Sequence, residues 1–492
     1  MMADPRGPIG DGGGSLRSRV TRGAILLTLR EGAGVLIGLV GVVALTRLIG
    51  PANYGLYAAA ATVFLYLNIL AQWGLPVFLV RREGELPDRV LHQGFVLAGL
   101  LGIAGLLAGW GLAPVIQTWA RIDGFANVAR VVLLALPGTL VAQVPRAILG
   151  RRLDFKALAS AELAGQIGFY AAAVPLAAAG LGVWSAVIGW WLQFVILWPM
   201  LYRAAHYRPR WVWDAELLSE MLRDGLSYTA ATWAWQARTL VNPLLVGRYA
   251  GVEAVGFVDL AVRLVENLGF VKTAATRVAV AALAQVQQDR ARLRSAIADG
   301  AMLQVLALGS LLVAFVIAAP WVIPLVFGEG WIGVMQVLPF VGLGALAHGL
   351  FNMEISGLYV VRQNTSVLKF HLLHVGLFAG AALVGLQRVG LAGYGWGELA
   401  ALLSYPVLHA VVSKSIGAPR LGIASVWAFA CACAVFVHTL GWWMALPLLA
   451  VAVWPRTWRE LRTVWGLIRR GGAPPDSRVS PPPASRPPLP GG

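Results

Sequence analysis

GFVDLAVRLVENLGFVKTAATRVAVAALA, residues 256–284, decides the fold because it combines membrane-spanning length with charge. The stretch is apolar enough to cross a bilayer as one helix, yet five of its residues are charged. At about 100° per residue, Asp259, Arg263, Glu266 and Arg277 share one helical face. A charge at bilayer depth costs roughly 2.5–3.5 kcal/mol, so such residues usually face a partner or a water-filled cavity. We therefore expect this helix to line a polar cavity; alternatively, its charges neutralise one another and only hold helices together.

Composition places most of the chain in a membrane. Its 492 residues are 58% hydrophobic and only 13% charged, whereas a soluble domain carries about 25% charged residues. Apolar runs recur from residue 23 to residue 455, and they are too long for the strands of a membrane barrel. The sequence therefore predicts an all-α, polytopic membrane bundle of about fourteen transmembrane helices. The expected spans lie near residues 24–46, 54–76, 91–113, 125–149, 158–179, 182–203, 225–247, 255–282, 296–319, 333–360, 366–387, 392–413, 422–440 and 442–456.

The positive charge follows a pattern typical of membrane proteins. The net charge is +16, and most of the 39 Lys and Arg residues fall in the two tails and in alternate loops. Cytoplasmic loops carry such an excess, so both termini are predicted to be cytoplasmic. The basic loops would face an anionic leaflet, and no nucleic-acid partner is needed to explain them. Cys431 and Cys433 fall on different sides of a helix and indicate neither a disulfide nor a metal site.

A short internal repeat predicts two related halves. RLIGPANYG at 47–55 and RYAGVEAVG at 248–256 both follow R-x-x-G-x-x-x-x-G, with an offset of 201 residues. An even number of expected spans separates them, so both copies enter the membrane in the same direction, as in a parallel repeat. Asp214 is expected to cap a short helix between the halves. The expected organisation is a disordered basic N-terminus at 1–22, a six-helix N-lobe at 23–205, a cytoplasmic interfacial linker helix at 206–224, a six-helix C-lobe at 225–415, two further helices at 420–460 and a disordered Pro-rich tail at 471–492.

Several of these segments resemble a known family of transporters. RLIGPANYGLYA at 47–58, WGLPVFLVRRE at 73–83 and GLGVWSAVIGWWLQ at 180–193 are similar to the polysaccharide-biosynthesis flippases, the Wzx-type lipid-linked oligosaccharide translocases. These proteins belong to the multidrug/oligosaccharidyl-lipid/polysaccharide exporter superfamily, with the MATE exporters and the lipid II flippases. The resemblance covers about residues 17–465 and includes GRRLDFKALASAE at 150–162.

The resemblance implies a fold, a cargo and a location. The fold would be a bundle of two pseudo-symmetric lobes around a central cationic cavity. The cargo would be an undecaprenyl-diphosphate-linked oligosaccharide or polysaccharide repeat unit, moved from the cytoplasmic to the outer leaflet of the bacterial cytoplasmic (inner) membrane. Membrane lipids, a glycan polymerase and glycosyltransferases of the same pathway are the further implied partners. No cofactor is expected, and the sequence contains no G-x-x-x-x-G-K-[ST] nucleotide-binding motif.

A pyrophosphate at bilayer depth needs fixed positive charge, which Arg supplies through bidentate hydrogen bonds. Arg30 and Arg238 lie in the first expected span of each half, and helices at the junction of the halves are the expected cavity lining. Arg277 could instead belong to the positive-inside pattern of the cytoplasmic mouth. The expected substrate-binding residues are Arg30, Arg238, Arg263 and Arg277. The carboxylates expected to pair with them, or to couple transport to an ion, are Glu31, Asp259 and Glu266.

A membrane bundle with these residues could also have other functions. An ion-coupled drug exporter of the same superfamily would share the fold, but cationic drugs favour an acidic cavity. A polytopic glycosyltransferase or glycan polymerase needs catalytic groups in sizeable external loops, and the expected external loops are short. His371 and His374, three residues apart, are expected to form hydrogen bonds between helices and not a metal site. We therefore expect a transporter and not an enzyme.

Overall fold

The computed structural model describes residues 12–82, 84, 86–269, 289–455 and 457–458. Within these ranges every regular element is helical and no strand is present, which confirms the expected all-α class. Eight helical stretches of the described chain are long and apolar enough to cross a membrane. Shorter apolar helices at Gly422–Ala434 and Trp442–Val453 accompany them. The chain is therefore a polytopic helical membrane protein.

The first helix, α1 (Gly12–Gln72), contains two of the expected spans joined by a kink. Gly50 has φ 72° and ψ 170°, a conformation that residues with a Cβ rarely adopt. Pro51 follows and lacks the N–H that would continue the backbone hydrogen bonds. The kink therefore separates the spans expected near 24–46 and 54–76. The short helix α2 (Leu75–Arg81) extends the second of them.

The other helices of the N-lobe follow the expected spans, with one irregular region. The span expected at 125–149 consists of three short helices, and Pro137 and Pro145 lie in the first turns of the second and third. Proline is tolerated in a first turn but interrupts a helix interior, which explains the breaks. The helices are α3 (Asp88–Ala120), α4 (Phe125–Leu133), α5 (Leu136–Val141), α6 (Gln143–Arg151), α7 (Phe155–Ala178) and α8 (Val183–Ala205).

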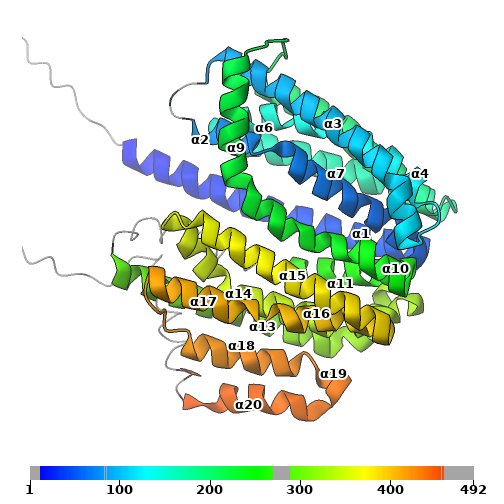
Figure 1. The fold of residues 1–492 in the computed structure, drawn as a ribbon, viewed down its shortest axis with the longest axis vertical. Coiled ribbons are helices and arrows are strands. Elements are labelled where there is room, and N and C mark those ends of the chain that lie inside the picture. Colours follow the sequence, from blue (N-terminus) through cyan, green and yellow to red (C-terminus); the bar gives the residue numbers. More distant parts are fainter. Residues whose placement is uncertain (1–11, 83, 85, 270–288, 456, 459–492) are drawn as a thin grey trace, which may run out of the picture.

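The segment between the halves differs from the expectation of a separate linker helix. α9 (Ala215–Gln236) begins where Asp214 accepts a hydrogen bond from the backbone N–H of Leu217 (3.2 Å), which confirms the expected cap. The helix contains no proline and continues past residue 224, and Figure 1 shows it changing direction on its way into the bundle. Pro243 lacks a backbone N–H, and this missing hydrogen-bond donor accounts for the irregular turns after α9. These turns are η1 (Ala237–Leu240), the π-helical η2 (Asn242–Val246) and α10 (Gly247–Ala250).

The charged stretch begins on α11 (Val252–Leu268). Gly251 precedes it with φ 88° and ψ 172°, close to the values at Gly50. Residues 270–288 lie outside the described residues. The later elements are α13 (Arg290–Phe327), η3 (Glu329–Gln336), α14 (Leu338–Val360), α15 (Asn364–Val389), η4 (Gly390–Gly393), α16 (Tyr394–Ala401), α17 (Ser404–Ser415), α18 (Gly422–Ala434), α19 (Val437–Leu440), η5 (Trp442–Ala445) and α20 (Leu446–Val453).

The two halves of the sequence lie on opposite sides of the molecule (Figure 1). Helices α3 to α8 form one side and α13 to α17 the other, with α18 and α20 at the outer edge of the second side. α1 and α11 lie between the two sides and pack against each other. We call this α1–α11 contact the seam. Buried residues from both halves join one hydrophobic core, so the seam is a packed contact and not a loose one.

Candidate functional site at the seam and in the C-lobe

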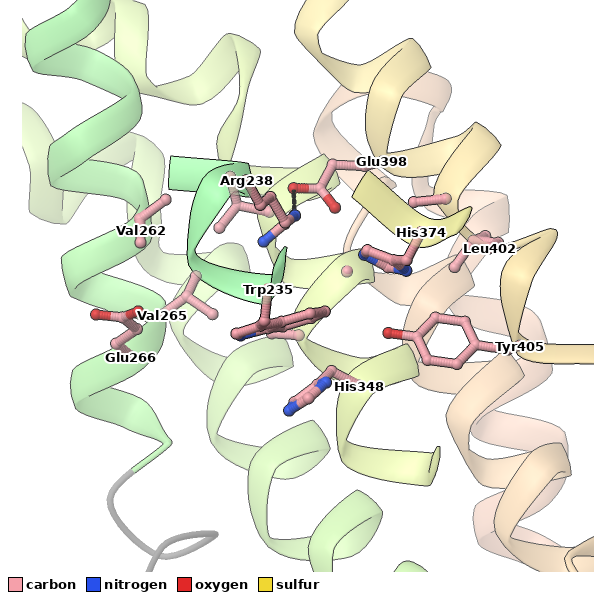
Figure 2. Close-up of a pocket in the computed structure, with 14 residues that line it drawn as sticks. Trp235, Arg238, Val262, Val265, Glu266, His348, His374, Glu398, Leu402 and Tyr405 are labelled. Carbon is pink, nitrogen blue, oxygen red and sulfur yellow. Dashed lines mark hydrogen bonds and ion pairs between the residues drawn. The ribbon is translucent and has the colours of Figure 1, made fainter. Parts of the chain in front are cut away.

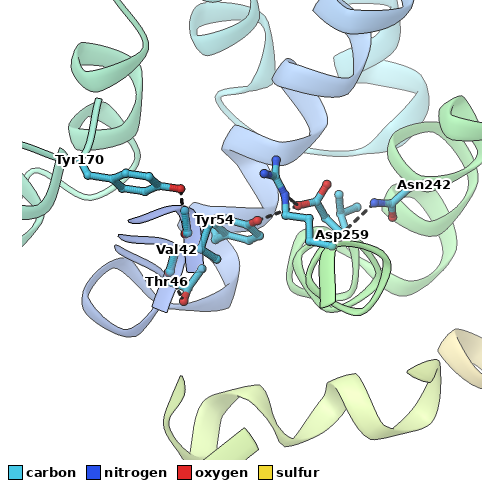
Figure 3. A network of polar contacts seen from close by, with 9 residues as sticks. Val42, Thr46, Tyr54, Tyr170, Asn242 and Asp259 are labelled. Carbon is cyan, nitrogen blue, oxygen red and sulfur yellow. Dashed lines mark hydrogen bonds and ion pairs between the residues drawn. The ribbon is translucent and has the colours of Figure 1, made fainter. Parts of the chain in front are cut away.

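An ion pair within α11 and a hydrogen bond between the two halves meet at the seam. On α11, Arg263 Nε donates to Asp259 Oδ2 at 2.7 Å, one helical turn away. Tyr54, in the second part of α1, donates its hydroxyl to the same Oδ2, also at 2.7 Å. Figure 3 shows Tyr54 reaching Asp259 from the neighbouring helix. The Asp259 carboxylate therefore links a cation of the C-lobe to a hydroxyl of the N-lobe.

The Arg263 side chain combines a fixed position with partial exposure. It is 39% exposed, whereas the side chain of Asp259 is 15% exposed. Arg263 also lies within electrostatic range of Tyr57 and Tyr170 of the N-lobe. Tyr170, on α7, donates to the backbone carbonyl of Gly38 on α1 at 3.2 Å, so α7 is fixed to the same helix (Figure 3). An anchored, partly exposed guanidinium where two lobes meet can bind an anion.

Arg238 lies in a different place, a pocket of about 210 Å³ lined by residues of α9, η1, α11, α14, α15, α16 and α17. It forms an ion pair with Glu398, as the dashed line in Figure 2 shows. The side chain of Arg238 is 26% exposed and that of Glu398 only 2%. The guanidinium also lies 4.4 Å from the ring centroid of Phe378, at cation–π distance. Glu398 therefore neutralises Arg238 within the C-lobe.

Trp235 and His374 line this pocket, and His371 also packs against Trp235. The ring centroids of His371 and His374 lie 5.0 and 5.2 Å from that of Trp235. His371 Nδ1 lies 2.9 Å from the carbonyl oxygen of Ala231 on α9. His374 Nδ1 lies 2.9 Å from the hydroxyl of Ser404 on α17. These contacts confirm the expected hydrogen bonds between helices.

A second buried carboxylate lies elsewhere in the C-lobe. Glu354 on α14 is fully buried, and its Oε1 lies 2.6 Å from Nδ1 of His409 on α17. Among the residues whose side chains the structure describes, the two buried acids, Glu354 and Glu398, thus each have a basic partner on another helix. Within the described part of the chain, no group of three or more His, Cys, Asp or Glu residues could hold a metal ion.

The structure separates the residues that the sequence grouped together. Asp259 and Arg263 form the expected i, i+4 pair at the seam. Glu266 is exposed and lines the pocket that contains Arg238. Arg30 and Glu31 lie on α1, where only the backbone is described, and Arg277 falls outside the described residues. Of the four arginines expected to bind substrate, the structure therefore places the side chain of Arg263 at the seam and that of Arg238 in the pocket.

Sequence reasoning did not identify Tyr54 as a partner of Asp259. Tyr54 lies inside the first copy of the repeat, at residues 47–55, but the repeat pattern does not show which helix this residue meets. The pairing of Arg238 with Glu398 could not be read from the sequence either, since 160 residues separate the two side chains. The fold of the C-lobe brings these two side chains, from η1 and α16, together.

Known proteins resemble this chain over most of its length. The family described as "Polysaccharide biosynthesis protein" matches residues 44–336, more than half of the chain. The lipopolysaccharide biosynthesis protein WzxC of Escherichia coli (strain K12) is 24% identical over 450 residues, covering 89% of this chain and 88% of that protein. The succinoglycan biosynthesis transport protein ExoT of Rhizobium meliloti (strain 1021) is 24% identical over 372 residues, covering 72% and 74%.

Solved structures show the same fold. The lipid II flippase MurJ, in an inward closed conformation, superposes with a TM-score of 0.64 at 13% identity, covering 91% of this chain and 99% of that one. An inward-facing multidrug resistance MATE family transporter of the MOP superfamily gives a TM-score of 0.60 at 16% identity, covering 77% and 95%. The family match over more than half of the sequence, together with this shared fold, leads to one conclusion: the chain belongs to the polysaccharide biosynthesis protein family.

Proposed function

We propose that the protein is a flippase for undecaprenyl-diphosphate-linked oligosaccharide or polysaccharide repeat units. It would carry them from the cytoplasmic to the outer leaflet of the bacterial inner membrane by alternating access of the seam to the two sides. Family membership supports the class of cargo. The observation that carries the mechanism is Arg263, a partly exposed cation anchored where the lobes meet. A pyrophosphate cannot cross hydrocarbon unaided, and such a cation stabilises it on the way.

Arg263 is the first proposed ligand of the pyrophosphate. Asp259 bonds to its Nε and so fixes the plane of the guanidinium. Bidentate recognition of phosphate by the Nη groups depends on such a fixed plane. Arg30 on α1 is the second proposed ligand, and Arg277 the third. Arg238 is a weaker candidate, because Glu398 already neutralises it inside the C-lobe.

The remaining roles follow from the same geometry. We assign charge pairing to Asp259, and ion coupling to Glu266, which lines the pocket that contains Arg238. Both termini are proposed to be cytoplasmic, with the basic loops on the anionic leaflet. Glycosyltransferases that build the cargo and a polymerase that consumes it are the proposed partners of the pathway.

Arg263→Lys tests the headgroup assignment in proteoliposomes loaded with a fluorescent undecaprenyl-diphosphate-linked oligosaccharide. Lysine keeps the charge and the Asp259 pair but loses the bidentate fork, so we expect transport to slow by about tenfold with stability unchanged. Arg388→Lys, at an exposed position near the end of α15, is the matched control and should transport normally. Equal rates for Arg263→Lys and the control would overturn the assignment. Transport of a cationic dye instead of the glycan would favour the drug-exporter alternative.

A further inference from the structure

The two copies of the repeat meet each other at the seam. A Cβ on Gly55 would overlap the carbonyl oxygen of Val252, and a Cβ on Gly256 would lie 2.6 Å from the carbonyl oxygen of Pro51. Residues 55 and 256 hold the same position in the two copies, and so do residues 51 and 252. Each glycine therefore packs on the equivalent position of the other copy, as twofold symmetry requires. Helix backbones approach this closely only where side chains are missing.

The arginine of each repeat copy binds the end of a helix in the opposite half. Arg47 Nη1 donates to the carbonyl oxygens of Leu325 (2.9 Å) and Val326 (3.4 Å), in the last turn of α13. Arg248 Nη1 donates to the carbonyl oxygen of Trp119 (2.6 Å), in the last turn of α3. The final carbonyls of a helix lack partners within the helix, and a cation there also interacts favourably with the helix dipole.

The pairing of each arginine with the opposite half follows the same twofold relationship as the glycines. α3 corresponds to the third expected span of the N-lobe, and α13 to the third expected span of the C-lobe. Each lobe's arginine thus caps the equivalent helix of the other lobe. Trp331 of η3 adds a contact at the same place: it donates Nε1 to the carbonyl of Thr46 at 3.3 Å and packs edge-on against Tyr54, with ring centroids 5.5 Å apart.

We propose that these two copies form the outer gate of the transporter, and that the structure shows the gate closed. The contacts lie at the kink of α1 at Gly50, between its two expected spans, and the charge pattern assigns this kink to the outer side. Separating α1 from α11 there would break the glycine contact. It would also break the hydrogen bonds of Arg47 and Arg248 to the helix ends of the opposite lobe. The gate therefore opens in one step. This inference rests on the proposed function, since a gate has a role only in a protein that opens to both sides.

A buried cysteine reports directly on the gate. Ala58 is 1% exposed and lies one turn from Tyr54, on the helical face that meets α11. The test protein carries Ala58→Cys, with Cys431 and Cys433 replaced by Ala. A membrane-impermeant maleimide is added outside intact cells, and the rate of labelling is measured. We expect slow labelling in this protein.

Removing the arginines of the two repeat copies should open the gate. We expect Arg47→Ala combined with Arg248→Ala to label the reporter at least about tenfold faster, the change that follows from losing charged hydrogen bonds. Gly55→Ala should raise labelling through steric overlap with Val252. Gly376→Ala, at a helical glycine with nothing within 4 Å, is the matched control and should label like the parent.

The possible outcomes test the gate proposal and the flippase proposal separately. Fast labelling in the parent, or equal labelling in the parent and the double arginine variant, overturns the gate. The assay requires no glycan, so labelling as expected together with absent glycan transport in proteoliposomes would refute the flippase and leave the gate standing. Normal glycan transport with unchanged labelling would refute the gate alone.

Discussion

Glu398→Gln removes the counter-charge of Arg238, and we expect the unfolding free energy to fall by about 2–4 kcal/mol. Removing one partner of a buried ion pair usually costs about 3–5 kcal/mol, because the other charge remains uncompensated. Two features of the pocket reduce this cost. Arg238 keeps 26% exposure, so water can reach it. Its contact with the Phe378 ring, at 4.4 Å, retains about 0.5–2 kcal/mol of cation–π stabilisation.

The measurement is the loss of helix on titrating purified protein from mild detergent into SDS, followed by circular dichroism. Arg238→Met combined with Glu398→Leu should recover most of the stability, because apolar residues often replace a buried pair without loss. Glu329→Gln, at an exposed position, is the control and should stay within about 0.5 kcal/mol of the parent. The reasoning is refuted if Glu398→Gln matches this control, or if the double variant is no more stable than Glu398→Gln.

Three further changes test contacts away from the pocket. Asp214→Ala removes the N-cap of α9, and we expect a loss of about 0.5–2 kcal/mol, detected as faster hydrogen exchange in the first turn of α9. Gly189→Ala would place a Cβ 2.7 Å from the carbonyl oxygen of Phe169, so we expect a loss of about 1–3 kcal/mol in thermal unfolding. His409→Leu leaves the fully buried Glu354 without its partner, and we expect the SDS titration to show a loss of about 1–3 kcal/mol.

For each of these three predictions, a control variant or a measurement could contradict the expected effect. Gly376→Ala adds a methyl group in open space within α15, and its stability should stay equal to the parent's or rise. If Gly189→Ala behaves in the same way, the close approach of α7 and α8 does not limit packing. A combined Glu354→Leu and His409→Leu variant should be more stable than His409→Leu alone. Unchanged exchange at the start of α9 would show that the Asp214 cap is dispensable.

The spans could be predicted because each depends on local sequence. Hydrophobic length identifies a membrane helix without knowledge of its neighbours. The same local logic predicted the Asp214 cap and the pairing of Asp259 with Arg263, which are four residues apart on one helix. The extent of α9 was missed because a polar composition marks the edge of the apolar region and not the end of a helix. Nothing in the sequence between residues 206 and 224 stops that helix after it begins.

The partners across helices could not be predicted. Helical periodicity tells which residues of one helix share a face, but it does not tell which helix that face meets. Tyr54 and Asp259 are 205 residues apart, and Arg238 and Glu398 are 160 apart. Both pairs depend on how the lobes pack. As a result, the sequence grouped Arg238 with Arg263, whereas the structure gives the two arginines different surroundings.

The capping of α3 by Arg248 and of α13 by Arg47 limits how the polypeptide can be divided. If the chain were produced as two fragments cut between α8 and α9, each fragment would carry the arginine that its counterpart needs. In each fragment alone, the last carbonyl groups of one helix would lack their arginine partner. Co-expression of the fragments would restore both bonds together. Two identical half-length subunits, each with one copy of the repeat, could cap each other's helix ends in the same way. The fold therefore has the geometry of an isologous homodimer joined into one polypeptide.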